Sequence, residues 1–225
     1  KLSGQVIKER KEGPGILDDY RQGSWGVARI CLDGIQNHLP NDAKGTTCWL
    51  HFEVDGKWVE AAEAKLTPEK ITRVRFADDG VGFTPDNLIY LHSTKTSEAD
   101  SVGQFGEGMK LASMASINLG LGMELQSRNW SAFAVGENRQ LINTRNNDSV
   151  EERKQLIYDI KEYDGEPIVG SRTIFHTPTK EFIDYALTLP EKVLDLDPNY
   201  RPLFTSEDGD IVSTSKGGQI FVKGI

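Results

Sequence analysis

Three short glycine-containing motifs hold the residues whose types and spacing could do chemistry. They are DGIQN at residues 33–37, DDGVG at residues 78–82 and GQFGEGMK at residues 103–110. An acid and an amide four residues apart share one face of a helix, so Asp33 and Asn37 would point to the same side. Three glycines directly before a helix leave bare backbone N–H groups at its positive end, and such an end binds anions. The third motif therefore indicates an anion-binding helix start.

Each motif also has an ordinary structural interpretation. Asp33 can form an ion pair with Arg29 one turn earlier, worth about 0.2–0.5 kcal/mol. Asn37 can cap the end of its helix, and Asp79-Gly80 is a common turn pair. The third motif fits neither of two familiar phosphate-binding motifs. A polar loop rather than a strand precedes it, which excludes a Rossmann unit, and the Lys-Ser/Thr ending of a P-loop is absent.

The acid and the amide of the first motif lie on a helix predicted over residues 25–38. Ser24 is a favourable N-cap residue, and Pro40 prevents the helix from continuing. Apolar residues recur at helical spacing on the face that would meet a core, namely Val27, Ile30, Cys31 and Ile35. The stripe with Asp33 and Asn37 therefore adjoins this buried face.

The rest of the pattern predicts one mixed α/β or α+β unit without internal repeats. Strands are predicted at residues 48–54, 57–60, 71–76, 123–128, 132–135, 140–143, 170–175 and 219–222. The first two should form a hairpin around Asp55-Gly56. Helices are predicted at residues 84–91, 109–119 and 181–189, an irregular lead-in at residues 1–15 and a mobile loop at residues 93–108.

Length and composition limit the classes of protein that this sequence can represent. With 225 residues, 37% hydrophobic and 27% charged, the chain suits one good-sized folded domain rather than a disordered one. A net charge of -8 argues against a surface built mainly to bind nucleic acid. Two cysteines and no long apolar run predict a soluble protein of a reducing compartment, without a membrane partner. The cytoplasm is expected, or the nucleus in a eukaryote.

Other site chemistries find little support. Cysteine and histidine residues lie within a short span, but their spacing matches no usual zinc pattern; they are Cys31, His38, Cys48 and His51. Cys48 and His51, three apart on a strand, would point to opposite faces. The four histidines of the chain nominate no catalytic triad, and its four tryptophans are expected to pack in the fold.

Taken together, the three motifs resemble those of the GHKL ATPase superfamily, named for gyrase, the ninety-kilodalton heat-shock chaperones, histidine kinases and MutL. Their order and spacing are similar to the family's N-box, aspartate-x-glycine-x-glycine motif and glycine-rich ATP lid. DDGVGFTPDNL and GQFGEGMKLASM look most like the microrchidia (MORC) and heat-shock-chaperone branches. The resemblance implies a Bergerat fold: an α+β two-layer sandwich with a mixed, mostly antiparallel sheet, helices on one face and a flexible lid.

The resemblance assigns roles to residues of the first two motifs. Asn37 would be a ligand of Mg²⁺, which suits a carboxamide oxygen because Mg²⁺ is a hard cation. Asp78 would accept a hydrogen bond from the amino group of adenine. Gly80 and Gly82 would let the backbone approach the base and ribose, because glycine has no Cβ.

The remaining implied contacts are with the phosphates and the base. The lid residues around the phosphates would be Gly103, Gln104, Phe105, Gly106 and Gly108. Lys110 or Lys95 would bring a positive charge to the terminal phosphate, and Lys110 is assigned to catalysis. The family's hydroxyl on a late strand corresponds to Ser171 first and Thr173 second, and Asp42 is an open candidate for a further contact.

Asp33 lies where most ATP-hydrolysing members of this superfamily have glutamate, the general base that orients the attacking water. Aspartate can do the same chemistry, but its carboxylate lies roughly 1.5 Å further back, and a misplacement of about 1 Å can cost about a hundredfold in rate. The resemblance together with this departure therefore implies slow hydrolysis.

The expected activity is Mg²⁺-dependent ATP binding that closes the lid and promotes dimerisation of a larger protein. The expected division is an arm at residues 1–23, the ATP-binding domain at residues 24–180, and an extension or the start of a following domain at residues 181–225. A nucleic acid or protein client could bind through regions outside this chain. Three alternatives stay open: an ATP sensor with little hydrolysis, a histidine kinase catalytic domain and a purely structural interaction domain.

Overall fold

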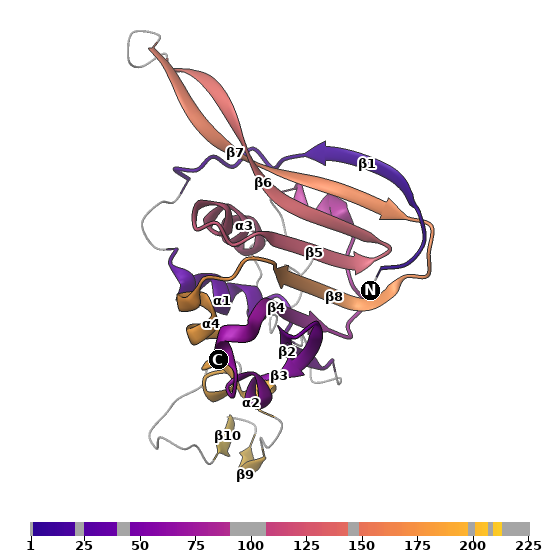
Figure 1. Ribbon diagram of the computed structural model, residues 1–225, viewed down its shortest axis with the longest axis vertical. Helices are drawn as coiled ribbons and strands as arrows, with labels where there is room; N and C mark the ends of the chain where they lie inside the picture. Colours follow the sequence, from indigo (N-terminus) through magenta and orange to yellow (C-terminus); the bar gives the residue numbers. More distant parts are fainter. Residues whose placement is uncertain are drawn as a thin grey trace.

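The computed structural model describes residues 2–20, 25–39, 46–90, 107–143, 149–197, 201–206 and 209–212. Within these ranges the chain combines a large antiparallel sheet with a few helices, as an α+β architecture requires (Figure 1). The eight strands of the main sheet run in the order β1-β7-β6-β5-β8-β4-β2-β3, and a separate two-stranded sheet pairs β10 with β9.

Every pairing among the described strands of the main sheet is antiparallel. The strands are β1 (Val6–Glu12), β2 (Cys48–Val54), β3 (Lys57–Glu60), β4 (Ile71–Asp78), β5 (Met123–Arg128), β6 (Trp130–Asn143), β7 (Ser149–Tyr163) and β8 (Ile168–Phe175). The small sheet contains β9 (Pro202–Ser206) and β10 (Gly209–Val212). The expectation of a mixed sheet is thus wrong for the described strands, since none of their pairings is parallel.

Three helices lie on one face of the main sheet: α1 (Val27–Gln36), α3 (Gly108–Asn118) and α4 (Lys180–Ala186) (Figure 1). Helix α1 packs against both α3 and α4. The short helix α2 (Ala61–Ala64) follows β3. Single 3-10 turns are η1 (Pro68–Lys70), η2 (Pro85–Leu88), η4 (Leu189–Glu191) and η5 (Leu194–Leu196). No helix within the described ranges has the length and apolar character needed to cross a membrane.

The strand β4 shows how the period of two divides the sheet into a buried and an exposed face. Val74 and Phe76 are fully buried in the core that the helices cover, and Phe76 meets Phe175 of β8 edge to face at 5.9 Å. Arg73 and Arg75 alternate with them, and their guanidinium groups lie 5.3 and 4.3 Å from the centre of the Trp58 ring. The helix-free face is therefore polar, and only the other face contributes to the core.

The N-terminal segment and the strand after residue 143 differ from the prediction. β1 is an edge strand that pairs with β7, not an irregular lead-in. β6 and β7 form one long hairpin that extends beyond the other strands in Figure 1. Charged residues at 151–154 hide the alternation of β7, because both faces of the outer hairpin are exposed or half-buried and need no apolar stripe.

The ends of several predicted helices also differ. The short helix predicted at residues 84–91 is present as the 3-10 helix η2 at Pro85–Leu88, which follows Thr84 and is shorter than predicted. Helix α1 begins at Val27 after Gly26, while Ser24, its predicted cap, lies outside the described residues. The predicted strand at 219–222 and most of the predicted loop at 93–108 also lie outside them.

Candidate functional site

Helix α1 carries the acid of the first motif at its inner face. Asp33 is only 8% exposed, since its side chain lies between the buried stripe of α1 and the start of α3. An i, i+4 ion pair with Arg29 engages its carboxylate, and the Arg29 guanidinium lies 5.3 Å from the centre of the Trp25 ring. Burial raises the pKa of Asp33 above its ordinary value, while Arg29 opposes the rise.

Asn37 is the C-cap residue of α1. Its Nδ2 donates to the carbonyl oxygen of Asp33 at 2.5 Å, which satisfies a carbonyl of the last turn. This bond leaves the Oδ1 atom to face other partners, and no hydrogen bond among the described residues engages it. A carboxamide oxygen in this state suits Mg²⁺, which usually takes one or two protein ligands together with phosphate oxygens and water.

Acidic, histidine and cysteine side chains do not gather into a ready-made metal cluster anywhere within the described ranges. Cys48 is buried on one face of β2, whereas His51 lies on the other and contacts Arg75 at 3.2 Å. The opposite orientation expected for Cys48 and His51 is confirmed.

The first turn of α3 faces Asp33. An added Cβ at Gly108 would lie 3.5 Å from Asp33 Oδ1, so the carboxylate closely approaches the end of the glycine-rich motif. Lys110, two residues further on, is 1% exposed, and its Nζ donates to the carbonyl oxygen of Asn87 at 3.1 Å. Its ammonium is therefore directed to η2 in this structure.

The buried ammonium of Lys110 predicts a pH dependence of folding. Burial lowers the pKa of Lys110 to about 8, against a weaker opposite effect of Glu107. Between about 8 and the ordinary lysine range the unfolded chain binds more protons than the folded one, so this group makes stability rise with pH. The unfolding free energy of wild type minus that of Lys110→Met, measured with urea at pH 7.5, 8.5 and 9.5, should therefore increase with pH. A pH-independent difference would contradict the prediction.

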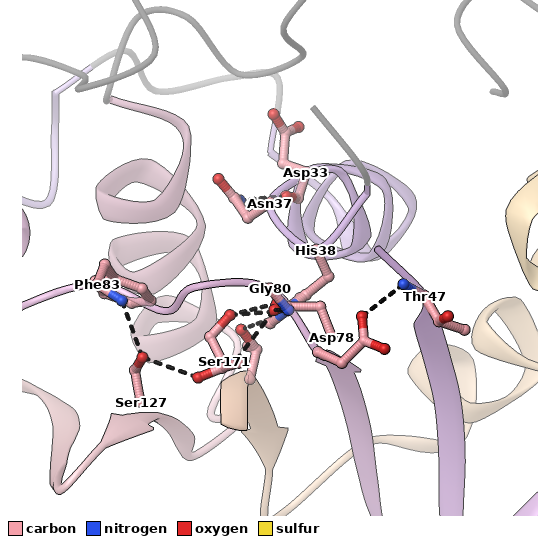
Figure 2. Close-up of polar contacts among 12 residues, drawn as sticks. Asp33, Asn37, His38, Thr47, Asp78, Gly80, Phe83, Ser127 and Ser171 are labelled. Atoms are coloured by element: carbon pink, nitrogen blue, oxygen red, sulfur yellow. Dashed lines mark hydrogen bonds and ion pairs between the residues drawn. The ribbon is translucent and has the colours of Figure 1, made fainter. Parts of the chain in front are cut away.

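Asp78, at the end of β4, is the centre of a polar network beneath α1 (Figure 2). Its Oδ1 accepts from the backbone N–H of Gly80 at 2.9 Å and from that of Ser171 at 3.2 Å. Its Oδ2 lies 2.6 Å from His38 Nδ1 and accepts a short hydrogen bond from the Ser171 hydroxyl. Although burial raises the pKa of Asp78, its hydrogen bonds with His38, Ser171 and Gly80 outweigh burial and hold it below the ordinary value.

His38 links the two halves of the candidate site. The ring is 2% exposed, and its Nε2 lies 2.8 Å from the hydroxyl of Thr173. Figure 2 shows the side chain directed from the end of α1 toward Gly80 and Ser171. The cysteine and histidine spacing pointed to His38 only as a zinc ligand, and the sole signal in the sequence for its present position is that it follows Asn37.

Two glycines of the site are required by their positive φ angles and by close contacts with neighbouring atoms. Gly170 has a φ of +69°, and an added Cβ would lie 1.9 Å from the Asp78 carbonyl oxygen. Gly82 has a φ of +67°, and its Cβ would lie 2.5 Å from the Ser127 hydroxyl, which donates to the Gly170 carbonyl oxygen at 3.0 Å. These glycines bring the turn after β4 against the start of β8.

The structure thus brings together most of the described candidates. Asp33, Asn37 and Gly108 lie where α1 meets α3, and Asp78, Gly80, Ser171 and Thr173 lie where β4 meets β8. Five other candidates lie outside the described residues, as does Asp42; they are Lys95, Gly103, Gln104, Phe105 and Gly106.

Comparisons with known proteins add no assignment to this geometry. Neither the scan against protein-family models nor the search of curated proteins gives a match to this chain.

Proposed function

We propose that this chain is an ATP-binding domain of the Bergerat type that hydrolyses ATP slowly with Mg²⁺. One observation carries the proposal. Asp33 and Asn37 lie one turn apart on α1, the carboxylate of Asp33 faces the start of α3, and Asp78 is anchored on the adjoining strand β4. The carboxylate of Asp33 can activate a water, and the amide oxygen of Asn37 can bind a cation. The helix start can bind phosphates, and the buried carboxylate of Asp78 can accept a hydrogen bond from a base.

Each group has a role in this proposal. Asp33 accepts a proton from the attacking water as general base, which requires that its carboxylate be ionised. Asn37 offers its Oδ1 to Mg²⁺, which when bound would neutralise phosphate charge. Backbone N–H groups at the start of α3 attract the phosphates. Asp78 accepts from the amino group of the base. Gly80 has no Cβ beside that carboxylate, and Gly82 keeps the turn packed against β8.

Slow hydrolysis follows from two features of Asp33. Its side chain is one methylene shorter than that of glutamate, and Arg29 competes with water for the carboxylate. In the same proposal, nucleotide shifts the domain between open and closed states and favours dimerisation, so that hydrolysis sets the lifetime of the closed state. Lys110 would have to leave Asn87 to reach a phosphate.

The ion pair of Asp33 with Arg29 also favours a second candidate function. Arg29 opposes the rise in pKa that burial gives Asp33 and occupies its carboxylate, so a domain of this kind could bind ATP as a sensor with little hydrolysis. Single-turnover measurements of phosphate release distinguish this sensor from the ATPase.

The proposed binding predicts a large ligand-dependent stabilisation. At a hundred times its dissociation constant, ATP with Mg²⁺ should stabilise the folded state by about 2.7 kcal/mol and raise Tm by about 5–10 °C. Thermal unfolding with ATP, GTP or no nucleotide, each with Mg²⁺ or a chelator, measures this rise. ATP with Mg²⁺ should give the largest shift. An equal Tm under all conditions would refute nucleotide binding.

A further inference from the structure

The face of the main sheet that the helices leave uncovered carries a pair of arginines from neighbouring strands. Arg75 of β4 and Arg172 of β8 are diagonal neighbours on that face, because Arg172 lies directly opposite Ala77 in the register of the two strands. Ser171 and Thr173 alternate with Arg172 and are buried on the helix-covered side. The arginine pair therefore lies on the far side of the sheet from the proposed nucleotide site.

Neither guanidinium of this pair has an acidic partner within the described ranges. Arg172 is half-buried, and no hydrogen bond or ion pair among the described residues engages it. Arg75 makes one hydrogen-bonding contact, with His51 Nδ1 at 3.2 Å, and its buried Nε has no partner. Burial and the positive charges of Arg172 and Arg73 lower the pKa of Arg75 to about 10. Two neighbouring positive charges thus remain uncompensated, which is costly for partly buried groups.

Two acids on the same face already have other partners. Glu53 accepts hydrogen bonds from Arg73 Nε at 2.5 Å and from the Thr72 hydroxyl at 2.7 Å. Glu124 lies 2.6 Å from His176 Nε2. The charge of the arginine pair is therefore left for a group that the described residues do not supply.

Aromatic side chains on the same face shape the surroundings of the pair. The Arg75 guanidinium lies 4.3 Å from the centre of the Trp58 ring, a cation–π contact that uses the face of the guanidinium and holds its orientation. The N–H donors lie in the guanidinium plane, so stacking leaves them available to oxygen atoms. Trp49 of β2, directly opposite Ala77, is 38% exposed. The pair therefore adjoins an open surface that an external group can reach.

We propose that Arg75 and Arg172 form an oxyanion site on the helix-free face, which takes a doubly charged phosphate group. Two guanidinium charges match a phosphate, which carries about −1.5 to −2 charges near pH 7, better than a carboxylate with one. Arginine also donates paired N–H groups to phosphate oxygens. The net charge of -8 favours one anionic group over a polyanion such as nucleic acid, because the rest of the chain repels a polyanion.

The phosphate group has two possible sources with the same chemistry. It is either free phosphate or a phosphate monoester carried by a partner protein, and the same N–H donors would bind both. The site does not depend on the proposed ATP binding, because it lies on the other face of the sheet and uses none of the residues assigned to the nucleotide.

The test measures Tm of the whole chain in inorganic phosphate and in sodium chloride of equal ionic strength, for wild type and Arg172→Gln. Phosphate should raise Tm of wild type. The apparent dissociation constant derived from that rise should increase about tenfold or more in Arg172→Gln, the effect of losing one charge-assisted hydrogen bond. Without phosphate the variant should melt no lower than wild type, since the substitution relieves repulsion with Arg75. Phosphate bound at the start of α3 would stabilise both proteins equally.

Lys161→Gln is the matched control for this test. Lys161 lies on the same face three strands away, in the row that runs from Arg172 through Gln126 and Ser131, and it pairs with Glu9 at 3.5 Å. The control removes the same charge and should keep the phosphate response. Arg172→Lys retains the charge without the planar fork, so it should weaken binding less. It also keeps the test valid if Arg172→Gln does not fold.

A short neutral peptide with one phosphoserine, compared with its unphosphorylated form, distinguishes the two sources. Binding tighter than that of inorganic phosphate supports a phosphorylated partner, and equal or weaker binding supports the free anion. An equal response of wild type and Arg172→Gln to both ligands would overturn the site. A rise in Tm with acetate as large as that with phosphate would overturn the assignment to phosphate. None of these measurements uses a nucleotide, so their outcome is separate from that of the proposed function.

Discussion

Replacement of Asp33 by asparagine is expected to lower the rate of ATP hydrolysis by about 10²–10⁴-fold, the range that a general base contributes. ATP binding should change little, since Asp33 acts on water rather than on the nucleotide. Phosphate release in a single turnover measures the rate, and titration with ATP measures binding. If the rate does not depend on residue 33, Asp33 is not the base and the sensor function is favoured.

The pH profile of hydrolysis adds a control from the neighbouring turn of α1. Activity should fall as the pH decreases through the pKa of Asp33, which burial holds above that of an ordinary aspartate. Arg29 stabilises the ionised carboxylate, so Arg29→Met should raise this pKa further and move the acid limb of the profile to higher pH. A shift to lower pH would contradict the roles given to Arg29 and Asp33.

Replacement of Asp78 by asparagine is expected to abolish the rise in Tm that ATP causes. Asparagine presents one acceptor oxygen and an amide that would face the donors of His38 and Ser171, so both the base contact and the network lose partners. Thermal unfolding with and without ATP measures the effect. A normal ATP-dependent shift would show that the base does not use Asp78.

The neighbouring acid provides the matched control for Asp78→Asn. Asp79 accepts a hydrogen bond from the backbone N–H of Thr47 at 2.6 Å, which joins the turn to the start of β2. The side-chain oxygen of asparagine can make the same bond, so Asp79→Asn should keep both the fold and the ATP-dependent shift. Loss of the shift in both variants would indicate damage to the turn rather than to the base contact.

Helices and strands were predictable from the sequence wherever one of their faces is apolar and packs against the core. Helix α1 follows from Ile30, Cys31 and Ile35, and β4 follows from the alternation of Arg73 and Arg75 with buried residues. The pairing of β1 with β7 was not predictable. β1 is an exposed edge strand without an apolar face, so period-two patterning gives no signal in it, although the residues 158–163 of β7 with which it pairs include buried ones.

The sequence by itself determined which residues are proposed to carry the chemistry, because Asp33 and Asn37 need only the helical repeat to share a face, and the glycines of DDGVG need only the turn that they form. Only the tertiary structure decided what Asp78 binds. His38 lies 40 residues before Asp78, and Ser171 lies 93 residues after it, so their contacts exist only when β4, β8 and the end of α1 are packed together. No local pattern encodes a contact over such a separation, because partners so far apart are chosen by the packing of the core.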